Sequence, residues 1–249
     1  MQKTWDELSP KLRKKTNMVV DYDERDCGLP NLIHAPKGTP RNIGGIRTFI
    51  YNHHRESYPK DPYFVMLDDD LRIFMRREDD PEKFIRATHE QQIEIFQDIE
   101  EQLRSGFAQI SMLAREGANR VTKRYMDNSR PLRVYAYDAR KIAKHGVRFD
   151  QCGTMDDFDV TLQLLEAGEQ NRVIAYAIHN QPGSNTAGGA AEYRTMDTHA
   201  DSAHKLKERH PQFVTVVTKK TTTPNAWGGM ERTDVRIAWK QAAQFGARK

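Results

Sequence analysis

The sequence predicts a single α/β domain with a mostly parallel central sheet flanked by helices. Segments with the periodicity of strands alternate with segments with that of helices. The apolar run 63–67 follows Pro62 and is continuous, which is typical of a central strand covered on both faces. No internal repeat or linker divides the 249 residues, so one domain over residues 1–249 accounts for the length.

The first half of the chain predicts alternating elements up to residue 113. Apolar spacing indicates the helices and short apolar runs indicate the strands. The expected elements are, in order, helix 5–15, strand 18–20, strand 32–34, helix 40–57, strand 63–67, helix 82–104 and strand 107–113.

The helix expected over residues 40–57 has a clear start and one unusual feature. Thr39 is a favourable N-cap, and Pro40 suits the first helical position. Gly44 and Gly45 lie inside the helix, where each costs about 1 kcal/mol relative to Ala. This cost indicates that a backbone or a ligand comes close to the helix at that point.

The second half of the sequence predicts further alternating strands and helices, which become less regular towards residue 249. A helix is expected to open within residues 153–159 and to end at Gly168. Around it we expect a basic loop 114–131, strand 132–137, helix 138–145, strand 172–179, a Gly/Ser/Asn-rich loop 181–191, helix 196–209, strand 213–217 and an irregular basic stretch over the last thirty residues.

Composition excludes several classes of protein. Apolar content is 37% and charged content 30%, which is not a disordered composition. No apolar stretch has the roughly 18 residues of a membrane span, and the amino terminus lacks the apolar core of a signal peptide. Two cysteines without metal-ligand spacing fit a reducing cytoplasm. The net charge of +4 and a pI near 9.0 are compatible with a polyanionic partner.

Asp68, Asp69 and Asp70 form the most informative motif, because they directly follow the expected central strand. Ligands of open α/β sheets bind beyond the carboxyl ends of the strands. Adjacent carboxylates repel one another, and a hard divalent cation carrying a phosphate-bearing ligand relieves that repulsion. A turn or a helix cap is the alternative, since Asp is a common turn residue. The strand before the motif favours the metal site.

A second acidic pair, Asp156 and Asp157, stands at an expected helix start. Thr154 to Asp157 fits a capping box, and acids in a first turn complement the helix dipole. A carboxylate in that place is also suited to act as general base towards an acceptor hydroxyl. From the residues alone the two interpretations are equally good.

Taken in order, these motifs resemble a known family. Residues 41–70 run from Arg-Asn-Ile-Gly-Gly to the triple Asp, and residues 153–168 add an acidic motif followed by a leucine-bearing helix. Over residues 17–180 this resembles nucleotide-sugar glycosyltransferases of the GT-A type. The resemblance implies a GT-A-like (Rossmann-like) domain with a donor and metal half, about 1–110, and an acceptor half with a C-terminal extension, about 111–249.

The resemblance also implies roles for individual residues. In that family a DxD motif holds Mn²⁺ or Mg²⁺ against the diphosphate of a sugar nucleotide. The implied metal ligands are Asp68 and Asp70, with His199 as a late ligand. The implied catalytic acids are Asp157 as base, with Asp156 beside it. The implied donor contacts come from Asp21, Asp23, Arg41, Arg47, Asp68 and Asp69. The alternative for the two arginines is a place on a solvated helix face, and the alternative for His199 is a structural role.

A narrower resemblance concerns the acceptor. The run Asp-Asp-Phe-Asp-Val-Thr-Leu-Gln-Leu-Leu is similar to phage glycosyltransferases encoded beside ten-eleven-translocation (TET) type dioxygenases. It implies transfer from a UDP-sugar to 5-hydroxymethylcytosine in DNA, in the host cytoplasm, and the basic segments 114–131 and 218–249 suit such a partner. GT-A domains begin with a strand and a nucleotide-gripping loop, which this sequence lacks or builds differently. The loop 181–191 is either a lid over the donor or an ordinary surface loop.

Three other functions are compatible with the same sequence. Nucleotidyltransferases and metal-dependent phosphodiesterases also cluster carboxylates around cations. A catalytically inactive protein that binds DNA through its basic segments is the third alternative, although no helix-turn-helix or zinc finger is evident. The product discriminates among them: transferred sugar, cleaved phosphodiester or neither.

Overall fold

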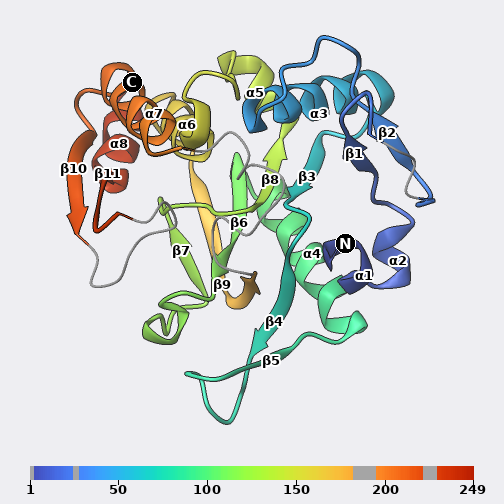
Figure 1. Ribbon diagram of the computed structural model, residues 1–249. Coiled ribbons are helices and arrows are strands. Elements are labelled where there is room, and N and C mark those ends of the chain that lie inside the picture. Colours follow the sequence, from blue (N-terminus) through green and yellow to red (C-terminus); the bar gives the residue numbers. More distant parts are fainter. Residues whose placement is uncertain (1–2, 25–27, 182–194, 221–228) are drawn as a thin grey trace.

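The computed structural model describes residues 3–24, 28–181, 195–220 and 229–249 (Figure 1). Its centre is a seven-stranded sheet with helices on both faces. The strand order is β3 (Tyr63–Leu67), β8 (Val134–Asp138), β6 (Gln109–Ala114), β9 (Asn171–Asn180), β4 (Arg72–Arg76) and β5 (Phe84–Arg86), with β7 (Tyr125–Asp127) paired to β9. The predicted α/β class is confirmed.

The prediction of a mostly parallel sheet is wrong. In this sheet the β6–β9 pair is parallel, whereas the β3–β8, β6–β8, β4–β9, β4–β5 and β7–β9 pairs are antiparallel. Residues 68–71 join β3 to β4, which are not neighbours in the sheet, and β4 itself was not predicted. Alternation along the chain therefore did not determine strand direction.

Helices bury both faces of the sheet. One core contains Ile95, Ile99 and Leu103 of α4 (His89–Arg104) packed against the sheet. The other core combines β3 and β8 with α3 (Ile43–Ser57), α5 (Ala139–His145) and α6 (Asp156–Glu166). In β3, Phe64 and Met66 enter the second core, Tyr63 and Leu67 pack on the first, and Val65 is exposed. The prediction of a central strand covered on both faces is therefore wrong, because β3 lies at the edge of the sheet and one of its faces is covered only in part.

Several predicted boundaries moved. The first helix is broken into α1 (Lys3–Glu7) and α2 (Pro10–Arg13), because Ser9 caps a new helix with Pro10 at its first position. The helix expected from residue 82 begins at His89, where Thr88 forms a capping box with Gln91, and β5 occupies part of the segment before it. In the basic loop the structure has a short 3₁₀ helix, η1 (Ala118–Arg120), and β7.

Among the last thirty residues, those that the structure describes form a strand and a helix, so the prediction of an irregular stretch is wrong for them. A third core joins α6 to α7 (Met196–Arg209), α8 (Trp239–Gly246) and the antiparallel hairpin of β10 (Val214–Lys220) and β11 (Glu231–Ile237). From Arg232 onwards in β11, charged residues alternate with Thr233, Val235 and Ile237, and this period of two is easily missed in a charged segment.

A separate two-stranded parallel sheet lies beside β3 in Figure 1 and consists of β1 (Met18–Val20) and β2 (Leu32–His34). Both short strands match their predicted positions. Within the described residues, no helix is long and apolar enough to cross a membrane.

The prediction of a close approach at the glycine pair is confirmed. A Cβ on Gly44 would lie 2.7 Å from the carbonyl oxygen of Phe149, and one on Gly45 would lie 2.3 Å from that of Pro40. Backbone at this distance excludes any side chain. The helix starts later than expected, at Ile43, with Asn42 as its N-cap. The glycines thus bring α3 against the loop that leads to α6.

We expect Gly44→Ala to lower the free energy of unfolding by about 2 kcal/mol, because overpacking against backbone outweighs the gain in helix propensity. Chemical denaturation measures this change. Glu56→Ala, at an exposed position of the same helix, is the matched control and should leave the midpoint unchanged. Equal stability of the two variants would contradict the contact with Phe149.

Candidate functional site

A large open cleft of about 2080 Å³ runs from β1 along β3 to α6 and the β10–β11 hairpin. The predicted site residues come from five separate parts of the chain, yet all but Asp23 line this cleft. Those that do are Asp21, Arg41, Arg47, Asp68, Asp69, Asp70, Asp156, Asp157 and His199. The fold therefore brings both predicted acidic motifs to one place.

Arg47 of α3 links the two acidic motifs. Its guanidinium forms an ion pair with Asp156 and lies 3.4 Å from a carboxylate oxygen of Asp68. The same group sits over the ring of Tyr135, 4.3 Å from the centroid. Arg47 is buried, so it is not the solvated helix face offered as the alternative. Burial favours its neutral form, but Asp156, Tyr135 and Asp68 outweigh this effect and raise the pKa of Arg47 well above its usual value.

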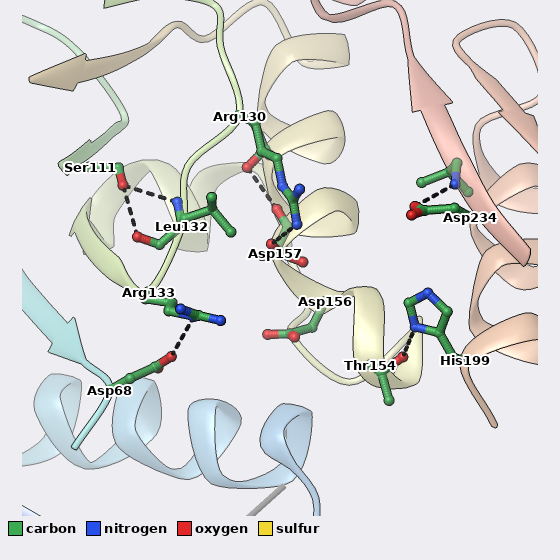
Figure 2. A network of polar contacts seen from close by, with 12 residues as sticks. Asp68, Ser111, Arg130, Leu132, Arg133, Thr154, Asp156, Asp157, His199 and Asp234 are labelled. Carbon is green, nitrogen blue, oxygen red and sulfur yellow. Dashed lines mark hydrogen bonds and ion pairs between the residues drawn. The ribbon is translucent and has the colours of Figure 1, made fainter. Parts of the chain in front are cut away.

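Asp68 lies between two arginines at the end of β3. Besides Arg47, the Nε of Arg133 lies 3.9 Å from its carboxylate (Figure 2). Its backbone N–H donates to the carbonyl of Arg133 at 3.1 Å. Arg133 has φ of +56°, an uncommon conformation for a residue with a side chain. This strained backbone holds the strand end and its carboxylate in register with β8.

The rest of the triple Asp is more exposed. The carbonyl oxygens of Asp68 and Asp69 accept hydrogen bonds from Thr4, which fixes the turn after β3 to α1. Burial and the neighbouring Asp69 raise the pKa of Asp70, and burial raises that of Asp68 despite its two arginines. Both carboxylates therefore lack part of the positive charge that would stabilise their ionised forms.

Asp156 and Asp157 open α6 and are both buried. Burial raises the pKa of Asp156 to about 6 even though Arg47 favours its ionised form. Asp157 faces Arg130, whose guanidinium lies 3.6 Å away (Figure 2). The predicted capping box is wrong: the N-cap is Met155, which makes no side-chain cap, and Thr154 belongs to the preceding 3₁₀ helix η2 (Gly153–Met155). Capping therefore does not explain the acidic pair.

His199 and the nucleoside candidates occupy opposite parts of the cleft. The Nδ1 of His199 on α7 lies 3.5 Å from the hydroxyl of Thr154. Among the described residues no three His, Cys, Asp or Glu side chains form a metal-binding group, so His199 does not join Asp68 and Asp70 in a ready-made cluster. Asp21 and Asp23 form exposed ion pairs with Arg41 near β1. The predicted lid, apart from Gln181, lies outside the described residues.

Three functional candidates were missed from the sequence. Arg130 and Arg133 flank Pro131 and Leu132 in a segment that was predicted to be loop and strand start. Tyr135 appeared to be an ordinary strand residue, yet its ring supports Arg47. Two basic residues around a proline are a weak signal, and no local pattern indicates which acid each of them meets.

A comparison with protein families gives one match. The family model described as TET-Associated Glycosyltransferase matches residues 14–189, which is more than half of the chain. No curated protein and no solved structure matches. The matched region contains both acidic motifs, Arg47 and the two missed arginines, and it ends before α7.

The raised pKa of Asp156 gives a stability prediction. A carboxyl group with a higher pKa in the folded state favours folding most when it is protonated. Its contribution therefore declines as pH rises from the ordinary value of 3.8 through about 6. This pKa rise corresponds to about 3 kcal/mol. Denaturation of the wild type and of Asp156→Asn across this range should show the wild type losing stability relative to the variant. A difference independent of pH would refute the assignment.

Arg47 should be essential to the fold. Arg47→Met leaves the buried carboxylate of Asp156 and the partly buried one of Asp68 without their main partner, so we expect a loss of about 3–5 kcal/mol of unfolding free energy. Arg41→Met removes an exposed guanidinium with two carboxylate partners of its own and should leave the melting temperature unchanged. Similar melting temperatures for the two variants would contradict the central position of Arg47.

Proposed function

Since this chain belongs to the TET-associated glycosyltransferase family, we propose that it moves a sugar from a nucleotide-sugar donor, a UDP-sugar, to the hydroxyl of 5-hydroxymethylcytosine in DNA. The observation that carries this proposal is the meeting of the two acidic motifs across Arg47 in one cleft. One motif is suited to the donor diphosphate and the other to an acceptor hydroxyl, as a glycosyl transfer requires.

The donor side of the site would be the end of β3. Asp68 and Asp70 offer hard oxygen ligands that lack sufficient positive charge, which fits Mn²⁺ or Mg²⁺. Mg²⁺ is commonly held by one or two carboxylates together with substrate phosphates, so a ready-made cluster of three ligands is not required. Such an ion would act as a Lewis acid on the leaving diphosphate. Asp69, Arg47 and Arg133 lie beside that position, and either guanidinium can pair with phosphate oxygens.

The acceptor side would be the start of α6. Asp157 would take the proton of the attacking hydroxyl while the bond between the sugar and the diphosphate breaks. Asp156 would act indirectly, because its ion pair with Arg47 fixes the helix start relative to β3. Arg130 pairs with Asp157 and would hold its carboxylate in place beside the acceptor hydroxyl.

Other predicted residues have more peripheral parts in this proposal. Asp21, Asp23 and Arg41 lie at the β1 end and would contact the nucleoside of the donor. His199 would contact the metal or the diphosphate only if the bound donor spans the distance between His199 and Asp68. The reaction would take place in the cytoplasm of an infected bacterium, where both sugar nucleotide and phage DNA are present.

The competing functions have less support. Membership of a glycosyltransferase family favours sugar transfer over nucleotidyl transfer and phosphodiester cleavage. The inactive DNA-binding protein remains an outcome of the experiment below.

The test uses the purified chain, Mn²⁺, a panel of UDP-sugars and duplex DNA containing 5-hydroxymethylcytosine. We expect a hexose-sized gain in nucleoside mass after digestion of the DNA. Asp157→Asn should reduce the rate by at least 10²-fold through loss of the base, and Asp70→Ala should abolish transfer through loss of a metal ligand. Asp79→Asn, at an exposed turn, is the matched control and should retain full activity.

The pattern of products separates the alternatives. Hydrolysis of one UDP-sugar without transfer to DNA would support the enzyme class and reject the acceptor. DNA binding without either reaction would support the inactive protein. Full activity of Asp157→Asn would reject the assigned base.

A further inference from the structure

The β10–β11 hairpin places two cations directly opposite each other. Lys219 and Arg232 are register partners in this antiparallel pair. Like charges in that position repel and destabilise a hairpin. The opposite face of the hairpin carries Val214, Val235 and Ile237 into the third core, so Lys219 and Arg232 project away from it. The repulsion between these two cations lowers the stability of the hairpin. The pair therefore indicates a role other than stabilising the hairpin.

Asp234 compensates only part of this charge. Its carboxylate lies 3.0 Å from the Nζ of Lys219 and 3.0 Å from a guanidinium nitrogen of Arg232. Burial opposes its ionisation, but the two cations hold the pKa of Asp234 below its usual value. Among the described residues, one carboxylate shared by two cations leaves one positive charge in excess. In the part of the chain that the structure describes, the buried Nε of Arg232 also lacks a hydrogen-bond partner.

The hairpin lies on the acceptor side of the cleft. In Figure 2, Asp156 and Asp157 are between Asp68 on one side and His199 and Asp234 on the other. Lys219, Arg232 and Asp234 line the same cleft as these acids, and so does Arg130. The hairpin thus faces the space next to the proposed base, away from the motif assigned to the donor diphosphate.

We propose that Lys219 and Arg232 form a phosphate-binding site for the DNA backbone of the acceptor. The proposal rests on the proposed function. It adds the element that holds the acceptor DNA strand while the hydroxymethylated cytosine reaches Asp157. A phosphodiester would bring the negative charge that Asp234 supplies only in part, and its oxygens would accept from the ammonium and guanidinium groups. The matched family region ends at residue 189, so this contact comes from outside it.

The test measures DNA binding without donor, by fluorescence anisotropy of a labelled duplex at several salt concentrations. Lys219→Gln and Arg232→Gln are made separately, so that Asp234 keeps one partner in each. Each variant should weaken binding several-fold at low salt and reduce the slope of log K against log salt by about one, the value expected for one lost phosphate contact. Lys220→Gln removes a neighbouring cation that pairs with Glu231 and should change neither quantity.

Kinetic measurements separate this proposal from the proposed function. With DNA as acceptor, both variants should raise KM and leave kcat unchanged. With the free nucleoside 5-hydroxymethyl-2′-deoxycytidine, which has no phosphate, both should behave as the wild type. If the chain binds DNA but transfers no sugar, the salt slopes still decide the proposal while the proposed function fails. Salt slopes of both variants equal to that of the wild type would overturn the phosphate site, whatever the activity.

Discussion

The buried guanidinium of Arg47 is the interaction on which the site depends. It joins α3 to the end of β3 and to the start of α6, so three elements distant in sequence share one charge. A buried cation is tolerable only with anionic partners, and these carboxylates likewise need a cation close by. The position of each group is therefore set by the others. Tyr135 completes the arrangement from β8 by covering the guanidinium.

This mutual dependence combines structure with chemistry. Asp68 and Asp156 are each needed to balance Arg47, while each also stands beside a carboxylate assigned to the reaction. A ligand that carries negative charge would compete with them for the guanidinium. The cleft would therefore respond to an incoming diphosphate through redistribution of existing ion pairs rather than through large movements of the backbone. The glycine contact between Gly44 and Phe149 supports that view, because it holds α3 against the loop before α6.

Much of the fold was predictable from local patterns, and the failures have a common physical origin. Apolar runs identified β3, β6 and β9, and alternation identified β8. Strand direction was not predictable, because it depends on which strands become neighbours and not on their composition. β4 was missed because its arginines mask its apolar residues, and the charged β11 was missed for the same reason.

The site was predictable to a similar extent. Both acidic motifs were recognised because successive carboxylates after a strand or at a helix start are unusual. Their partners were harder to find. Arg47 was selected among several arginines, but its burial was not foreseen, and Arg130 and Arg133 were not singled out at all. An ion pair across the chain leaves no local pattern, so only the assembled fold identifies it.

The packing of α8 against α6 also affects the candidate site. The carbonyl of Leu165 lies so close to Gly246 that a Cβ there would be 1.9 Å away, and Phe158 in the first turn of α6 stacks on Trp239. The last helix thus buttresses the helix that carries both candidate catalytic acids. Loss of this packing would release the start of α6 from its support. A truncation before α8 would therefore disturb both candidate acids although it removes neither of them.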